Sequence, residues 1–574
     1  MKRYYIQGTI ILLEPLHIGS GEEEEFVDNP LLRDELGNPL IPGTSMAGVM
    51  SSLLERILRL KGYAGDALKE EHSLLFGKGD EDAFESCLIV HDLPLISRQE
   101  RMIEDHNAVD RKRGSALKER LFHTEVLPSG TAFEFTCEFR ERFRDSDKNE
   151  KALVFLIDIL ELMEHGRAWI GGRSGTGHGR FRLDGLCCKV LDMTDPEHVL
   201  LFTRNSLQDT IKALPQVTLF ELKKDTPSLT PVNTSSSKGQ EFSPEVVMIE
   251  GVLRPVEPLL VKTGLSLETV RLQGSRINEE EIKEKLKDCP VRDETVSVDS
   301  AFCREKSIPY LPGSSIRGVL RSHAERMLRT IVYKKVIKDS PDEAKRIASD
   351  SAWDLEKLEQ KGKELQNEPF DKIYKSACLI SRVFGFTAMG GRVRVSNAYP
   401  LNPEAFEKGL KLMDHVAIDR FTGGSAEGKK FNARPFFPTN PPDGSGDMCF
   451  YICLEDFEKW HFGLIALLLK DLMNGRIAIG YGKNKGFGRV RLLPETLRIR
   501  VLTSKGGELK GYLNTNNKIA EIIEGEIEVK RGRNFWIDRS CRFYEYVRDS
   551  IMDFRDKLNE WINREDKHEQ SQSQ

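Results

Sequence analysis

The chain contains the same series of motifs twice, and this internal repeat constrains its fold more than any other feature. Four short blocks recur in the same order in the two halves of the chain. The first block recurs after 270 residues and the other three after 308 or 309 residues. Order and spacing together predict two domains of one type, with extra residues in the second domain. The paired blocks are 42–48 and 312–318, 76–77 and 384–385, 105–111 and 414–420, and 177–183 and 486–492.

Composition predicts a linker between the two domains and an extension after them. The region between the copies is poor in apolar residues and rich in Ser, Thr and Pro, which is typical of a linker. The charged stretch 338–375 is the expected insertion in the second domain, and it reads as a solvated helix. After the second copy we expect a mostly helical extension, with an amphipathic helix around 544–562 and a disordered tail from 568. The predicted boundaries are 1–205 for the first domain, 222–245 for the linker, 246–500 for the second domain and 501–574 for the extension.

Each copy shows the pattern strand–helix–strand–strand–helix–strand. The opening strand is expected at 4–13 and again at 246–253, and a helix follows each Pro-Gly turn. Ser45 and Ser315 are suitable N-cap residues for these helices. Alternating apolar runs and a second amphipathic stretch follow in each copy. The fold class is therefore α+β, with two tandem ferredoxin-like or RRM-like domains.

Charge and cysteine content exclude several classes of protein. The 574 residues include 85 Lys and Arg against 90 Asp and Glu, so the net charge of −5 gives no overall attraction for polyanions. A polyanion site would have to be local. The ten cysteines form no C-x-x-C pair, which argues against zinc ribbons and a secreted disulfide scaffold. The longest apolar stretch, 464–469, is far shorter than a membrane span. We expect a reduced, cytoplasmic protein.

An acidic residue precedes the first helix of each copy in a matching frame. Asp28 stands 14 residues before Pro42, and Asp299 stands 13 residues before Pro312. A carboxylate in such a loop can bind a divalent ion or deprotonate a hydroxyl group. It can equally close a local Asx-turn. The residues alone leave both interpretations open.

Two glycine-rich segments at equivalent positions are locally basic. Residues 166–182 contain four arginines and no acid, and residues 476–491 contain five basic residues and no acid. Glycine lets the backbone approach a phosphate, and the exposed N–H groups form an anion nest. A tight β-turn with incidental charge is the alternative interpretation. The candidate polyanion-binding residues of these segments are Arg173, Arg180, Lys483, Lys485 and Arg489.

The repeated Asp-His-x-Ala-x-Asp-Arg block leads into a glycine-tipped segment in both copies, which predicts a protruding hairpin or loop. The first is crowded with basic residues, among them Arg111 and Arg113. His106 and His415 can be general acids, but neither has a matched base nearby in sequence, so a structural role is the alternative. His178 has no histidine counterpart, because Phe487 stands at its place in the second copy. The candidate residues of the two hairpins are His106, Asp110, His415 and Asp419.

The motifs LHIGSG, VDNPLLRD, PLIPGTS, LFG, DHNAVDRKRGSA and GRSGTGHGRFRL together resemble the RAMP superfamily. More narrowly, they resemble the backbone subunits of type III CRISPR effector complexes, the Csm and Cmr groups. Two such domains in one chain are similar to the fused backbone subunits of type III-D complexes. The resemblance covers about 1–190 and about 246–495.

This resemblance implies a guide-RNA-binding palm, and a thumb hairpin that inserts through the guide–target duplex. It also implies cleavage of target RNA at the displaced nucleotide by Asp28 and Asp299, leaving a 2′,3′-cyclic phosphate. The implied cofactor is Mg²⁺ or Mn²⁺, bound transiently at the cleavage sites. The implied partners are guide RNA, target RNA and other subunits of the complex (further backbone, capping and large subunits), with no membrane. The residues implied to contact guide RNA around the first helix of each copy are Gly43, Ser45, Gly313, Ser315, Arg317 and Arg321.

The two copies depart from the family pattern in opposite directions. The second copy has Arg317 and Arg321 on the helix where the first has Ala47 and Ser51, so we expect guide contact to depend more on the second helix. The first copy keeps a proline after its aspartate, whereas the second has Ala301. Three alternatives remain: a catalytically inert RNA-binding scaffold, a guide-processing RAMP endonuclease, and an unrelated metal-dependent phosphohydrolase. The acidic loops argue against the second, and the absence of clustered His and Asp ligands argues against the third.

Overall fold

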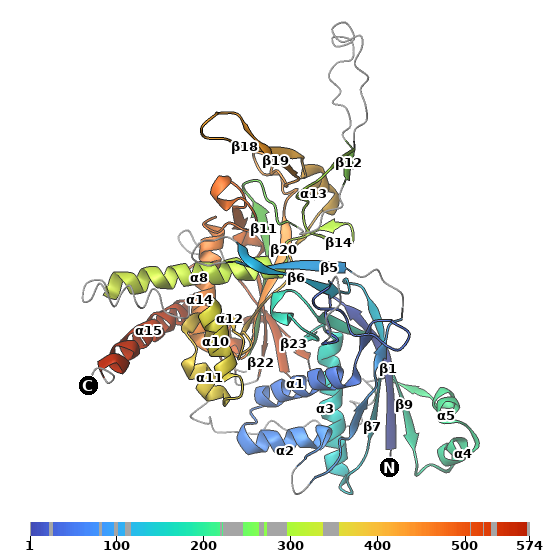
Figure 1. The fold of residues 1–574 in the computed structure, drawn as a ribbon. Helices are drawn as coiled ribbons and strands as arrows, with labels where there is room; N and C mark the ends of the chain where they lie inside the picture. Colours follow the sequence, from blue (N-terminus) through green and yellow to red (C-terminus); the bar gives the residue numbers. More distant parts are fainter. Residues whose placement is uncertain are drawn as a thin grey trace.

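The architecture was obtained from a computed structural model of the chain (Figure 1). The structure describes residues 2–21, 27–79, 83–96, 102–109, 116–218, 221, 245–262, 269–271, 295–336, 355–504, 507–519, 522–529 and 537–570. Within these ranges, no helix is both long enough and apolar enough to cross a membrane.

The first domain is an antiparallel sheet with helices packed on it, as the α+β prediction requires. Its central strand β1 lies between β7 and β9, and the path of the sheet is β10-β9-β1-β7-β3. Helix α1 buries Met46, Met50, Leu54 and Ile57, which recur at helical spacing and face the core. The elements of this sheet and its helices are β1 (Lys2–Leu12), β3 (Leu88–Val90), β7 (Ala132–Arg140), β8 (Ala168–Trp169), β9 (Arg180–Asp192), β10 (Gln216–Val217), α1 (Gly43–Leu60), α2 (Gly65–Phe76) and α3 (Ser146–Glu164).

The second domain repeats this arrangement on a larger sheet with the path β16-β20-β11-β22-β24-β23. Helix α14 is apolar nearly all round because α15 packs against it, and Gly463 on α14 lets the backbone of Ser550 approach closely. The sheet contains β11 (Val246–Pro255), β16 (Val393–Val395), β17 (Tyr399–Pro400), β20 (Met448–Leu454), β21 (Val490–Leu492), β22 (Arg498–Thr503), β23 (Leu513–Ile519) and β24 (Ile522–Ile527). Its helices are α8 (Gly313–Val336), α10 (Leu355–Leu365), α11 (Phe370–Ser376), α12 (Leu379–Phe384), α14 (Lys459–Met473) and α15 (Phe543–Gln570).

The C-terminal extension contains the predicted helix as its longest element, α15, but it also contains two strands that the sequence did not predict. Strands β23 and β24 follow the predicted boundary at 500 and extend the sheet of the second domain, and β22 crosses that boundary. The strand β24 is buried on both faces: Ile522 packs in the core cluster of the first domain and Ile527 in that of the second, and Glu524 between them pairs with Arg167 of the first domain. The predicted tail is helical as far as Gln570, so only its last four residues lie outside the described ranges.

The predicted N-caps were also wrong. Helix α1 begins at Gly43 with Pro42 as its N-cap and no side-chain cap, so Ser45 lies inside the first turn. Ser315 likewise lies inside α8, which begins at Gly313. Each helix start is tied to a distant side chain: Gly43 N donates to Asp92 Oδ1 (2.7 Å), and Gly313 N donates to Asn397 Oδ1 (2.7 Å). A tertiary hydrogen bond has replaced the local cap.

Both predicted hairpins are present. The first comprises β5 (Met102–Val109) and β6 (Ala116–Val126), and the second comprises β18 (Met413–Ile418) and β19 (Ser425–Ala433). In Figure 1 the second hairpin projects from the top of the molecule, whereas the first extends toward the second domain. The tip of the first hairpin, with Asp110, Arg111 and Arg113, lies outside the described residues.

The linker, the insertion and the shorter elements complete the described fold. Linker residues 222–244 and insertion residues 337–354 lie outside the described ranges, and α10 and α11 form the described part of the expected helical insertion. The other elements are β2 (Leu40–Ile41), β4 (Leu93–Pro94), β12 (Thr269–Arg271), β13 (Thr295–Ser297), β14 (Arg304–Glu305), β15 (Ile308–Pro309), α4 (Pro196–Arg204), α5 (Leu207–Ala213) and α13 (Pro403–Gly409).

Candidate functional site

Each of the two loop aspartates is bonded to the base of its own hairpin. Asp28 Oδ2 accepts a hydrogen bond from the backbone N–H of His123 (2.6 Å), and Asp299 Oδ2 accepts one from Asn432 N–H (2.8 Å). His123 and Asn432 are 309 residues apart, the spacing of the hairpin motifs. Both aspartates are exposed. The repeat therefore holds in three dimensions, and the two carboxylates occupy equivalent positions.

This arrangement differs from a local Asx-turn, because the partner of Asp28 lies 95 residues away in sequence. One carboxylate oxygen fixes the loop to the hairpin, and the carboxylate as a whole stays accessible to solvent. The loop around Asp28 is held further by Asn29 N–H to His123 O (3.1 Å) and by Glu125 N–H to Asn29 O (3.0 Å). A carboxylate on a loop held in this way is positioned before any ligand arrives.

The surroundings of the two aspartates are different. At the first, His123 Nδ1 lies 2.6 Å from Asp105 Oδ1 on the opposite strand of the hairpin. At the second, Asn432 replaces the histidine, and Asp414 pairs with Lys430 at 3.4 Å. Sequence reasoning did not single out His123. The repeat contained a sequence signal for this position. Asp105 and Asp414 begin the paired hairpin blocks, and in the structure Asp105 lies opposite His123 and Asp414 opposite Asn432.

A resident metal site is not formed here by the part of the chain that the structure describes. Within those residues, no group of three or more His, Cys, Asp or Glu side chains is arranged to hold an ion. Each loop offers one aspartate carboxylate, one oxygen of which already accepts a backbone hydrogen bond. These donors do not fit a dedicated protein cage for a divalent ion, which takes six or more oxygen ligands.

The first glycine-rich loop, around the 3-10 turn Ser174–Thr176, is docked on the second domain. A Cβ at Gly177 would lie 2.5 Å from Asn397 Oδ1, so only glycine permits this approach. The guanidinium of Arg173 lies 4.9 Å from the centre of the Phe122 ring, and that of Arg180 lies 4.9 Å from the centre of the Tyr451 ring. Burial lowers the pKa of Arg173. Both arginines therefore stabilise contacts within the chain.

The equivalent loop of the second domain has no such intramolecular dock among the described residues. A Cβ at Gly486 would meet no atom within 4 Å. Lys485 Nζ lies 5.6 Å from the centre of the Tyr481 ring, and Arg489 pairs with Glu257 at 2.8 Å. Burial lowers the pKa of Lys483. Of the two glycine loops, this one presents basic side chains at a more open surface.

Arg317 and Arg321 donate hydrogen bonds within their own domain, and the Arg317 guanidinium also lies beside Gly175 of the first glycine loop. Arg317 donates to Phe384 O and, at 3.4 Å, to Val393 O, and burial lowers its pKa to about 10. Arg321 donates to Gly385 O (2.9 Å) and to Glu325 Oε1 (3.2 Å). In this structure the protein itself accepts their hydrogen bonds.

The hairpin histidines are packed against aromatic rings. His106 stacks on Phe122 with the ring centres 5.2 Å apart, and burial lowers its pKa to about 4. His415 stacks on Phe431 at 4.8 Å, and burial lowers its pKa as well. This packing supports the structural interpretation of both residues. Asp419 closes the turn of its hairpin by accepting hydrogen bonds from the N–H groups of Phe421 (2.8 Å) and Thr422 (3.0 Å).

A buried polar cluster joins the first hairpin to the second domain. Glu104 accepts hydrogen bonds from His178 Nε2 (2.8 Å) and, across the interface, from the Tyr310 hydroxyl (3.1 Å). Burial acts to raise the pKa of Glu104, but the charge and hydrogen bond of His178 outweigh it and lower that pKa to about 2. Burial likewise acts to lower the pKa of His178, but Glu104 raises it above its usual value. The two side chains form a buried ion pair.

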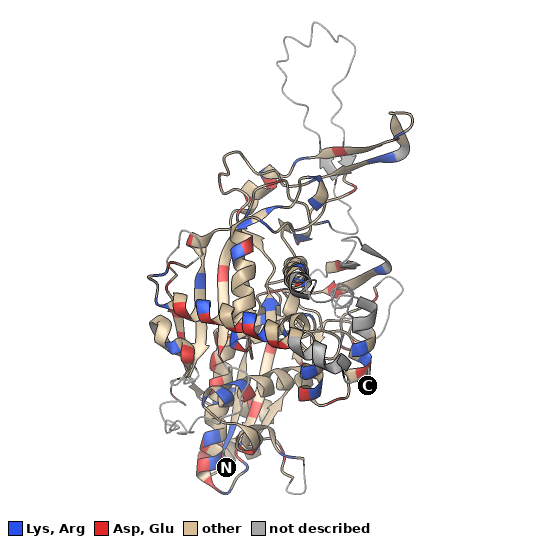
Figure 2. Ribbon diagram, turned by 90° about the vertical axis from the view of Figure 1, so that its left-hand side faces the viewer, with Lys and Arg blue, Asp and Glu red and all other residues tan. Residues whose placement is uncertain are grey.

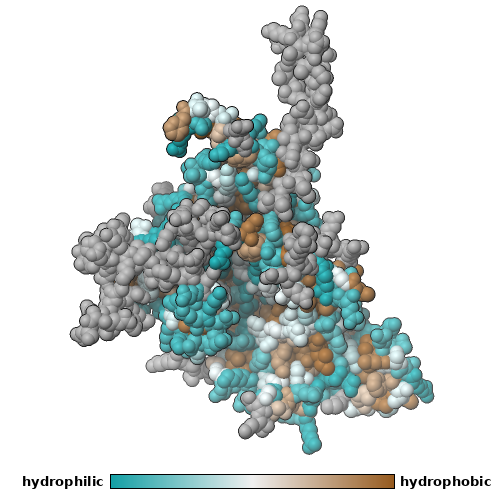
Figure 3. All heavy atoms as spheres, viewed as in Figure 1, coloured by the Kyte–Doolittle hydropathy of each residue, from teal (hydrophilic) through white to brown (hydrophobic). Residues whose placement is uncertain are grey.

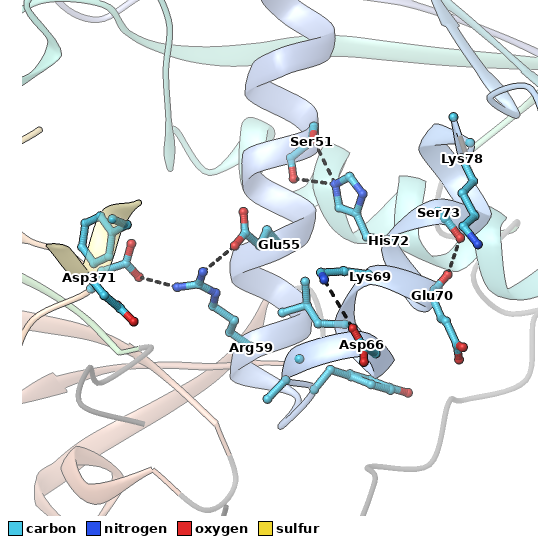
Figure 4. Close-up of a pocket in the computed structure, with 18 of the residues that line it drawn as sticks. Ser51, Glu55, Arg59, Asp66, Lys69, Glu70, His72, Ser73, Lys78 and Asp371 are labelled. Carbon is cyan, nitrogen blue, oxygen red and sulfur yellow. Dashed lines mark hydrogen bonds and ion pairs between the residues drawn. The ribbon is translucent and has the colours of Figure 1, made fainter. Parts of the chain in front are cut away.

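A large pocket lies away from both aspartates. It has a volume of about 1500 Å³ and opens between α1 and α2 of the first domain and α11 of the second (Figure 4). In Figure 4, Ser51 faces His72, and the Ser51 Oγ to His72 Nε2 distance is 2.9 Å. Ser51 stands where the second copy has Arg321, which fills the corresponding space there. The lining mixes acidic and basic residues and includes none of the predicted site residues.

Charged residues of both signs are interspersed over the body of the molecule (Figure 2). The projecting hairpin has in addition an apolar end, which is visible in Figure 3. Val416 and Ile418 are exposed, and Phe421 is fully exposed. A fully exposed Phe at the tip of a protruding hairpin is typical of a contact surface.

Comparison with known proteins agrees with this geometry. Residues 9–182 and 252–491 each match the profile of the RAMP superfamily. A protein of Methanocaldococcus jannaschii named CRISPR system Cms endoribonuclease Csm3 is 29% identical over 204 residues, which are 32% of this chain and 80% of that protein. Proteins of the same name from Methanothermobacter thermautotrophicus and Mycobacterium tuberculosis are 28% and 26% identical, each over 32% of this chain and over 85% and 86% of their own lengths.

Proposed function

The chain belongs to the RAMP superfamily, and from this premise we propose that it is a backbone subunit of a type III CRISPR effector complex, with two backbone domains in one chain. It binds guide RNA and cleaves the paired target RNA, one cut for each domain. The observation that carries this proposal is the equivalent placement of Asp28 and Asp299, each bonded to the base of a hairpin. The similarity to proteins named Csm3 endoribonucleases supports the reaction class. The proposed partners are guide RNA, target RNA and further subunits of the complex.

The geometry suits cleavage next to a displaced nucleotide. A hairpin that enters the guide–target duplex forces one target nucleotide out of A-form geometry, so that its 2′-hydroxyl can line up with the adjacent phosphate. Each aspartate lies where its hairpin leaves the domain, and would act at the nucleotide displaced there. The sites would then be separated by the fixed distance between the two domains.

We include a divalent ion, Mg²⁺ or Mn²⁺, in the proposal, recruited together with the RNA. The described residues do not build a resident metal site, so most of its ligands would be phosphate and water oxygens. When bound, such an ion neutralises charge on the reacting phosphate.

Guide RNA contact is proposed for the second glycine loop in particular. Lys483 and Lys485 lie on its 3-10 turn, and that turn is not covered by another domain among the described residues. The corresponding loop of the first domain is occupied by its contact with α8 and β16. An RNA phosphate would reach the second loop without displacing a contact between the two domains.

Cleavage of end-labelled target RNA by the guide-loaded complex tests the proposal. Asp28→Asn and Asp299→Asn are the appropriate variants, because an amide oxygen still accepts the hairpin N–H while the carboxylate charge is lost. Each variant should lose one product of the ladder and keep target binding, and the double variant should lose both. Reactions with Mg²⁺ and with EDTA test the ion.

Asp34→Ala is the matched control, since Asp34 lies in the same loop but only closes the turn to Asn38. Asp34→Ala should keep the full ladder. An unchanged ladder in the double variant would contradict the proposal and leave the chain as an inert RNA-binding scaffold. Cleavage of guide precursor instead of target would favour the processing endonuclease.

A further inference from the structure

We propose that His123 is a catalytic residue of the first cleavage site, and that its Nε2 atom receives the proton of the target 2′-hydroxyl. Asp105 is the positioning residue that orients its ring. This inference rests on the proposed function of Asp28 and extends it to a residue type that the second site lacks.

The first argument is the hydrogen bond between His123 and Asp105. The two residues are directly opposite each other on β6 and β5, and the His123 Nδ1 to Asp105 Oδ1 distance is 2.6 Å. A carboxylate only accepts hydrogen bonds, so Nδ1 carries the proton, and in the neutral ring Nε2 keeps its lone pair as an acceptor. Orientation of an imidazole base by a carboxylate is the general arrangement of proton-transfer sites.

The second argument is accessibility. The side chain of His123 is 27% exposed, whereas that of Asp105 is 7% exposed, so the carboxylate is held in the protein and the ring reaches the surface. No hydrogen bond to Nε2 is found among the residues that the structure describes. The other histidines near this hairpin are enclosed: His17 and His178 are buried, and the His106 side chain is 11% exposed. Of these four, His123 is the one that a nucleotide can reach.

The third argument is the contact with Asp28. The Asp28 carboxylate lies 2.6 Å from the backbone nitrogen of His123. The imidazole is attached to that same residue, so this hydrogen bond places the Asp28 carboxylate beside the residue that carries the ring. A nucleotide displaced at the first hairpin therefore meets both groups at once.

The step balances as follows. The 2′-hydroxyl transfers its proton to His123 Nε2 while the 2′-oxygen forms a bond to phosphorus. The bond between phosphorus and the 5′-oxygen breaks, and the leaving oxygen takes a proton from solvent. The products are a 2′,3′-cyclic phosphate and a 5′-hydroxyl, and the ring then returns its proton to water.

The second domain provides the natural control. Asn432 occupies the position equivalent to His123, and its amide cannot accept a proton at neutral pH. The cross-strand aspartate is present in both copies, since Asp414 lies opposite Asn432 as Asp105 lies opposite His123. We therefore expect the second site to cleave more slowly than the first, because a positioned general base contributes roughly 10²- to 10⁴-fold.

The test measures the rate of each product separately, using end-labelled target RNA and the guide-loaded complex. His123→Asn should slow the first product by about 10² or more and leave the second product unchanged. The hairpin tolerates Asn here, since the second copy has it naturally. His123→Ala should lose the same product, and added imidazole should restore it, which a purely structural role would not allow. Asn432→His should accelerate the second product.

Asp28→Asn in parallel separates this inference from the proposal on which it rests. Suppose that Asp28→Asn loses the first product, while both His123 variants form that product at a rate within threefold of the wild type. This result would overturn the role of His123 and leave the role of Asp28 intact. Failure of imidazole to restore the first product in His123→Ala, with target binding intact, would also overturn it. If Asp28→Asn keeps the first product, the proposed function itself fails.

Discussion

Replacing His178 by Phe tests whether the buried ion pair is needed where the two domains meet. Phe is the residue that the second copy has at this position, Phe487, so the shape is compatible with the fold. In the first copy, however, the change removes the cation that is hydrogen-bonded to Glu104, and the remaining histidine, His106, lies farther away, with its Nε2 atom 3.5 Å from Glu104 Oε2. The Glu104 side chain is 9% exposed and that of His178 is 3% exposed, so water cannot replace the lost partner.

The magnitude follows from this burial. Removing one partner of a buried ion pair costs about 3–5 kcal/mol of unfolding free energy. The Tyr310 hydroxyl still donates to Glu104, so we expect the lower end, about 3 kcal/mol. For a domain of this size, that corresponds to a fall of roughly 6–12 °C in the unfolding midpoint.

The double variant Glu104→Met/His178→Phe is the decisive comparison. It installs both residues of the second copy, Met413 and Phe487, and leaves no charge buried. Its cost is the unpaired Tyr310 hydroxyl, about 1–3 kcal/mol, which Tyr310→Phe should remove. The double variant should therefore be more stable than His178→Phe alone. Thermal and urea unfolding of the full chain measure this order. A double variant as unstable as the sum of its single variants would refute the ion-pair reasoning.

Three further predictions concern pH, helix starts and RNA contact. The ion pair should stabilise the wild type most, relative to Glu104→Met/His178→Phe, between about pH 4.5 and 6.5. This difference in unfolding free energy should shrink as the pH falls toward 2, where Glu104 is protonated, and as the pH rises through the raised pKa of His178, where His178 loses its proton. Urea unfolding midpoints of both proteins across this pH range measure the difference. Gly313→Ala should destabilise the chain by more than about 1 kcal/mol in thermal unfolding, since the new Cβ would lie 2.4 Å from Val395 O. Gly318→Ala is the control on the same helix: its new Cβ meets no atom within 4 Å, so this variant should be more stable than the wild type by about 0.5–1 kcal/mol. Lys485→Ala should weaken guide-RNA binding similarly for all guide sequences and lower the slope of log affinity against log salt by about 0.7–0.9, and an unaltered slope in a salt titration would remove Lys485 from the contact surface.

The sequence predicted the architecture well where the signal was repeated. Two RAMP domains and both hairpins follow from motifs that recur in the same order, and apolar periodicity placed α3 and α14. Strands β23 and β24 were not predicted, because they have no counterpart in the first copy and their charged faces resemble a solvated segment. Repetition was the strong signal, and the unrepeated extension lacked it.

The site was predicted less completely, because sequence separates residues that the fold brings together. Asp28 was identified from its spacing to Pro42, but its bond to His123 joins positions 95 residues apart. The start of α1 was assigned to Ser45, although Asp92 from a distant loop takes that role. Arg173 was predicted to meet phosphate, yet it lies against Phe122. A basic residue in a glycine loop is equally suited to an aromatic ring, and only the three-dimensional neighbours decide between them.

The differences between the copies are concentrated where the first domain touches the second. Glu104 and His178 form an ion pair at that contact, whereas the second copy has Met413 on its hairpin and Phe487 in its glycine-rich segment at the equivalent places. Arg180 lies on Tyr451 of the second domain, but its counterpart Arg489 pairs with Glu257 of its own domain. In the first copy these residues stabilise the contact between the two domains, whereas, within the described part of the chain, their counterparts in the second copy contact only their own domain or solvent. Because the first glycine loop already packs on the second domain, the second loop is the one that we propose for guide-RNA contact.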